Sequence, residues 1–73
     1  MEIYKGEGNK GRVYYVFDRK KKPEIAIQEA ARESKNAVKD MLIIPVWTNG
    51  IELYLEPAKG AIKAFAVVRK GKK

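Results

Sequence analysis

Residues 43–56 read IIPVWTNGIELYLE, two apolar runs separated by Asn49 and Gly50. An Asn-Gly pair between strand-forming residues predicts a β-hairpin, because a tight type I′ turn needs positive φ at both central positions and these two residue types tolerate it best. A turn made of this pair alone places Thr48 opposite Ile51. The stretch is therefore expected to form the central hairpin of an antiparallel sheet.

Side chains alternate between the two faces of a strand, so this register predicts one apolar face and one aromatic and acidic face. The apolar face is expected to carry Ile44, Val46, Ile51, Leu53 and Leu55. The second face is expected to carry Trp47, Tyr54, Glu52 and Glu56. The first face would form the core of the domain, and the second would be open.

Three more strands are indicated by short runs of β-branched and aromatic residues. They are expected within residues 2–5, 12–19 and 61–69. A turn at residues 57–60 would pair the last strand with the second arm of the hairpin. Ile62, Ala64 and Ala66 would then join the core, while Lys63, Phe65, Val67 and Arg69 would point to the open face.

Residues 24–41 have the spacing of an amphipathic helix, with apolar and small side chains recurring every three or four positions. Ala30 and Ala31 fall on the side expected to contact the core face of the sheet. The predicted fold is a single small α+β domain over residues 1–69, an antiparallel ββαβββ sheet with one helix packed on one face. Residues 70–73 would form a basic tail.

The composition disfavours an enzyme, since the chain contains no cysteine and no histidine. Their absence removes disulfides, common zinc sites and the usual groups for acid–base catalysis near neutral pH. We expect no catalytic residues, no metal site and no cofactor. The sequence also shows neither a signal peptide nor an apolar run of about 18 residues, so we expect a cytoplasmic protein without membrane contact.

The glycine-rich segment 6–13, GEGNKGRV, has the form G-x-G-x-x-G-x-V. With the residues that follow it, this segment resembles the glycine-rich loop of the protein kinase amino-terminal lobe. That family places its phosphate-pairing lysine in V-A-I-K, where this chain has Gln28 at the end of IAIQ, and the H-R-D and D-F-G motifs are missing from the sequence. Kinase activity is therefore excluded, and the segment is expected to be a hairpin loop.

Basic residues dominate the charge, with 16 Lys and Arg against 9 Asp and Glu and a net charge of +7. The positive electrostatic field of so large a net charge attracts nucleic acid or acidic protein surfaces. The open sheet face and its edge would bring aromatic and basic side chains together: Trp47, Tyr54, Phe65, Lys63, Arg69, the run Arg19, Lys20, Lys21 and Lys22, and also Tyr14. Aromatic rings stack bases and cations neutralise phosphates, which predicts a nucleic-acid-binding module, single-stranded or weakly sequence-specific, for DNA or RNA.

The same aromatic face would also suit a protein partner. Exposed aromatic surface is typical of homodimer and protein–protein interfaces. A self-associating or protein-binding module therefore remains the alternative.

Overall fold

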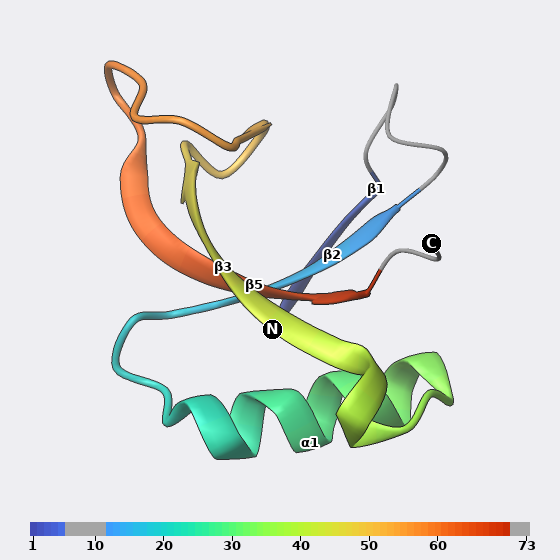
Figure 1. The fold of residues 1–73 in the computed structure, drawn as a ribbon. Helices are drawn as coiled ribbons and strands as arrows, with labels where there is room; N and C mark the ends of the chain where they lie inside the picture. Colours follow the sequence, from blue (N-terminus) through green and yellow to red (C-terminus); the bar gives the residue numbers. More distant parts are fainter. Residues whose placement is uncertain (6–11, 71–73) are drawn as a thin grey trace.

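The computed structural model describes residues 1–5 and 12–70 (Figure 1). Its elements are β1 (Glu2–Lys5), β2 (Val13–Phe17), α1 (Pro23–Ser34), the short 3₁₀ helix η1 (Val38–Asp40), β3 (Met41–Thr48), β4 (Leu53–Tyr54) and β5 (Ile62–Arg69). The strands form one antiparallel sheet on which α1 packs, so the predicted α+β fold and its ββαβββ order are confirmed. The predicted glycine loop and most of the predicted tail, at residues 6–11 and 71–73, lie outside the described residues.

The strand order is β1-β2-β5-β3-β4, which places β5 in the middle of the sheet. The predicted pairing of β5 with the second arm of the hairpin is therefore wrong. β5 pairs with β3 over its whole length, from Met41 opposite Arg69 to Thr48 opposite Ile62, and with β2 on its other side. Both β3 and β5 are eight residues long, so their pairing forms a long ladder. β4 is a poorer partner for β5, because Pro57 lacks an N–H and limits any extension of β4.

The turn after β3 is longer than predicted and spans residues 49–52. Its geometry depends on the side chain of Asn49, whose Oδ1 accepts hydrogen bonds from the backbone N–H groups of Ile51 at 2.9 Å and Glu52 at 2.8 Å. Gly50 has a φ of 89°, a conformation that disfavours residues with a Cβ. The Asn-Gly pair thus marks the turn, but as part of a loop that the asparagine side chain bridges.

The longer loop shifts the hairpin register. Thr48 lies opposite Leu53 instead of Ile51, and Trp47 lies opposite Tyr54. Because the shift is by two residues, the side chains keep their predicted faces, and Trp47 and Tyr54 share one face. Three residues predicted in the core are exposed instead: Ile51 by 82%, Leu55 by 50% and Ile62 by 76%.

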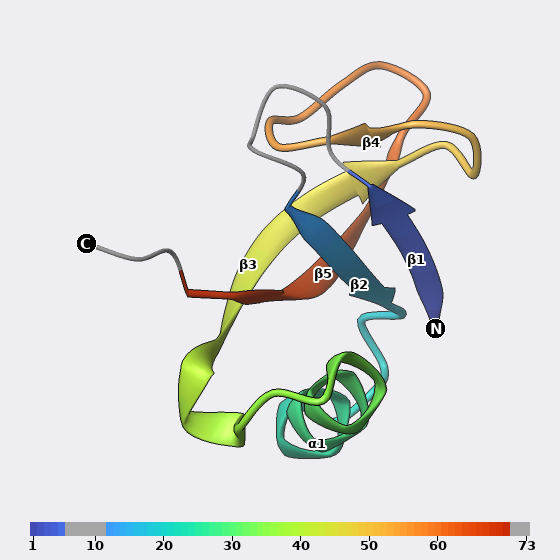
Figure 2. The same cartoon turned by 90° about the vertical axis from the view of Figure 1, so that its right-hand side faces the viewer.

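The sheet is strongly curled, as Figures 1 and 2 show, and it buries apolar side chains on both faces. We call the face that α1 covers the outer face, and the face inside the curl the inner face. The outer-face cluster comprises Phe17, Met41 and Val67 with Ala26, Ala30 and Ala31 of α1. The inner-face cluster comprises Tyr14, Val16, Val46, Ala66 and Val68.

The prediction of one helix-covered core on the Ile44 and Val46 face is therefore wrong, because α1 lies on the opposite face. Both faces of the central strands are apolar, so both need cover. The helix covers one face, and the curl of the sheet covers the other. At the end of the curl the Tyr4 hydroxyl lies 3.1 Å from the hydroxyl of Thr48, which links β1 to the end of β3.

The helix ends at Ser34, earlier than predicted, and Met41 begins β3. Lys35 adopts a left-handed conformation with a φ of 58°. The Asn36 N–H donates to the carbonyl of Ala31 at 3.0 Å, while the Lys35 N–H donates to Arg32. This is a Schellman C-cap, in which local backbone bonds end a helix whose apolar spacing continues beyond it.

Enlarging Ala30 is expected to destabilise the fold. Its side chain is fully buried between α1 and the sheet, so Ala30→Leu should overpack the contact and lower the free energy of unfolding by about 1–3 kcal/mol. Lys39→Ala, at an exposed position, should change the free energy of unfolding by less than about 0.5 kcal/mol. Urea denaturation of both variants measures the difference, and equal effects would contradict the observed packing of α1.

Candidate nucleic-acid interface

The helix covers only part of the outer face. In Figures 1 and 2 the halves of β3 and β5 nearest β4 curve away from α1. This distal half of the outer face carries Trp47 and Tyr54, which are half-buried, and Lys63, which is exposed. An aromatic surface therefore remains accessible beside the helix-covered core.

Trp47 is the centre of a row of side chains that crosses three strands. It pairs with Tyr54 of β4 on one side and with Lys63 of β5 on the other. The Lys63 ammonium lies 5.9 Å from the centroid of the Trp47 ring, within the range of a cation–π contact. At the other end of the row, the Tyr54 hydroxyl donates a hydrogen bond to the Glu52 carboxylate at 3.4 Å.

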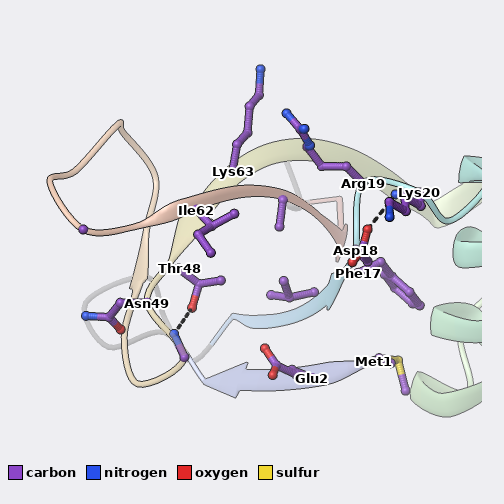
Figure 3. Close-up of a pocket in the computed structure, with 14 residues that line it drawn as sticks. Met1, Glu2, Phe17, Asp18, Arg19, Lys20, Thr48, Asn49, Ile62 and Lys63 are labelled. Atoms are coloured by element: carbon purple, nitrogen blue, oxygen red, sulfur yellow. Dashed lines mark hydrogen bonds between the residues drawn. The ribbon is translucent and has the colours of Figure 1, made fainter.

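The turn after β2 places a further cation, Arg19, on the Lys63 side of the sheet. The Asp18 carboxylate accepts a hydrogen bond from the backbone N–H of Lys20 at 2.8 Å, which closes the turn around Arg19. Figure 3 shows the Arg19 and Lys63 side chains on the same side of β5, and both residues line one surface hollow. We call Tyr54, Trp47, Lys63 and Arg19 the aromatic–basic row.

A hollow of about 940 Å³ lies beside the row, where the ends of β1, β2, β3 and β5 approach one another (Figure 3). Three cations stand along its edge, Arg19, Lys20 and Lys63, and we call them the basic rim. The wall of the hollow includes the apolar side chains of Val16, Ala64 and Ile62 together with the carboxylates of Glu2 and Asp18. The hollow is open and combines apolar walls with both signs of charge.

Two of the predicted aromatic residues lie away from the row. Phe65 packs against the helix-covered cluster and stacks on Phe17, with ring centroids 5.8 Å apart and an interplanar angle of 19°. Tyr14 is on the inner face and only 3% exposed. The prediction that Tyr14 shares an open face with Trp47 is therefore wrong, because the curl of the sheet covers it on the inner face. Phe65 does lie on the outer face with Trp47, but it is half-buried against the helix-covered cluster.

The predicted basic residues are also divided. Arg19 and Lys20 lie on the basic rim, whereas the Lys21 ammonium is 3.1 Å from the Glu29 carboxylate of α1. Lys22 is exposed and immediately precedes α1. Arg69 is at the opposite end of β5 from Lys63.

The hollow was not predicted from the sequence. Glu2 and Ile62 come from the first and last strands, and a local pattern gives no indication that these strands meet at one site. Of the predicted site residues beside the hollow, Arg19 and Lys20 were identified from the basic run after β2, and Lys63 from its place on the predicted open face. The sheet order and the curl decide which residues surround it.

Within the described ranges, no helix is long and apolar enough to cross a membrane. No cluster of three or more Cys, His, Asp or Glu side chains suited to a metal ion occurs in the same part of the chain. No protein-family model, curated protein or solved structure matches the chain.

Proposed function

We propose that this protein binds single-stranded nucleic acid with limited sequence preference through the aromatic–basic row. The observation that carries the proposal is the Lys63 ammonium placed 5.9 Å from the Trp47 ring on the part of the outer face beyond the helix. An accessible ring bordered by a cation offers a base a stacking surface and offers the adjoining phosphate a counter-charge.

The strands give the row a suitable geometry. Trp47 and Tyr54 are held side by side by direct cross-strand pairing, so successive bases could stack on two rings presented by rigid elements. Lys63 borders the Trp47 ring and lines the same hollow as Arg19 and Lys20, and these three cations would contact the phosphates. The net charge of +7 adds a long-range attraction for any polyanion.

The salt dependence of binding tests the role of Lys63. Lys63→Ala should lower the slope of log affinity against log salt by up to about 0.7, the effect of one lost phosphate contact on a single strand. Arg69→Ala removes the same charge at the far end of β5 and is expected to leave the slope near that of the parent. Fluorescence anisotropy with single-stranded and duplex oligonucleotides at several salt concentrations gives these slopes. Equal reductions in both variants would mean that net charge alone drives binding.

A protein-binding or self-associating module is the second candidate. It is favoured by three exposed aliphatic side chains near the β3–β4 loop and the start of β5: Ile51, Leu55 and Ile62. Analytical ultracentrifugation of the protein without nucleic acid separates the two functions. A stable dimer that Ile62→Ser converts to a monomer would support self-association, whereas a monomer would leave the row free for a nucleic acid.

A further inference from the structure

The open edge of β5 connects the row with the hollow. β2 pairs with β5 only as far as Phe17 opposite Phe65, so within the described sheet residues 62–64 of β5 have β3 on one side and no strand on the other. Figure 3 shows Ile62 and Lys63 leaving β5 on opposite sides, Ile62 toward the hollow and Lys63 away from it. The Lys63 ammonium contacts the Trp47 ring of the row. The basic rim therefore borders both surfaces. A strand whose phosphates lie on the rim can place one base on the row and the next base in the hollow.

Glu2 is the carboxylate best placed to contact a base there. It lies opposite Val16 on β1, and Figure 3 shows its side chain rising from β1 toward the hollow. One carboxylate oxygen accepts a hydrogen bond from the Tyr4 hydroxyl at 3.0 Å, which orients the group. Because each carboxylate oxygen has two lone pairs, both oxygens of Glu2 can accept further bonds. The Asp18 carboxylate, by contrast, closes its own turn through the Lys20 N–H.

We propose that the hollow binds one unstacked guanine of the bound strand, whose N1–H and N2–H groups donate to the two oxygens of Glu2. This inference rests on the proposed function. Guanine presents two adjacent donors on its Watson–Crick edge, which match two carboxylate oxygens. Adenine and cytosine place an acceptor beside their amino group, and thymine and uracil have acceptors on both sides of one N–H, so a carboxylate repels part of each edge. The aliphatic side chains of Val16, Ala64 and Ile62 would contact the ring.

The test uses two oligonucleotides of about 12 nucleotides, within the usual site size of a small single-strand-binding domain: all-dT, and the same sequence with one central dG. The parent protein is expected to bind the dG oligonucleotide about 5-fold or more tightly than all-dT. Glu2→Gln should abolish this preference, since an amide replaces one acceptor with a donor. Asp18→Asn removes the same charge at the same hollow and should retain the preference, because the asparagine oxygen can still accept the Lys20 N–H bond.

The possible failures are distinct. Equal affinity of the parent protein for both oligonucleotides would overturn the guanine site and leave the proposed function intact. A guanine preference that survives in Glu2→Gln would overturn the role of Glu2. Failure of the parent protein to bind either oligonucleotide at low salt would overturn the proposed function, and the guanine site with it.

Discussion

Phe17→Ala is expected to leave the domain largely unfolded at room temperature. Phe17 is 4% exposed, packs with the buried alanines of α1 and stacks on Phe65. Removing a buried phenylalanine ring lowers the free energy of unfolding by about 3–5 kcal/mol. A domain of this size without disulfides rarely has more than about 3–5 kcal/mol in total. The loss is therefore comparable to the whole stability of the fold.

Far-UV circular dichroism and urea titration measure this effect. The control is Ile62→Ala, which shortens an aliphatic side chain that is 76% exposed on β5 and should change the free energy of unfolding by less than about 0.5 kcal/mol. A Phe17→Ala protein that unfolds at the urea concentration of the parent would contradict the placement of Phe17 between the sheet and α1.

Trp47→Ala is expected to weaken single-strand binding by about 1–3 kcal/mol, the contribution of one base stacked on one aromatic ring. The protein should remain folded, because Trp47 is half-buried on the part of the outer face beyond α1. Its stability should fall less than that of Phe17→Ala. Fluorescence anisotropy at constant salt gives the affinity, and circular dichroism of the same sample confirms folding.

Trp47→Phe is the matched variant, since it keeps an aromatic ring of smaller area at the same position. Its affinity should lie between those of the parent and Trp47→Ala. If Trp47→Ala binds as tightly as the parent, bases do not stack on this ring. If the same substitution instead converts a dimer to a monomer, the aromatic–basic row is a protein interface.

Local sequence patterns determined the elements of this fold and their order. The Asn-Gly pair marked the turn after β3, alternation placed Trp47 and Tyr54 on a shared face, and the three-and-four spacing located α1. These features depend on residues close together in the chain, where φ preference and side-chain periodicity act directly. The aromatic residues at the centre of the candidate site could be predicted for this reason.

Tertiary structure alone decided the partner of β5, the face that α1 covers and the position of the hollow. Ala64 and Phe65 illustrate why, since both faces of β5 carry apolar residues and a local pattern does not show which face meets the helix. The long ladder between β3 and β5 displaced β4 to the edge, and the curl then closed the inner face. That arrangement packed Phe65 against the helix-covered cluster, separated Arg69 from Lys63 and brought Glu2 to the hollow. Such choices depend on how much apolar surface the whole sheet must remove from water, which no single segment determines.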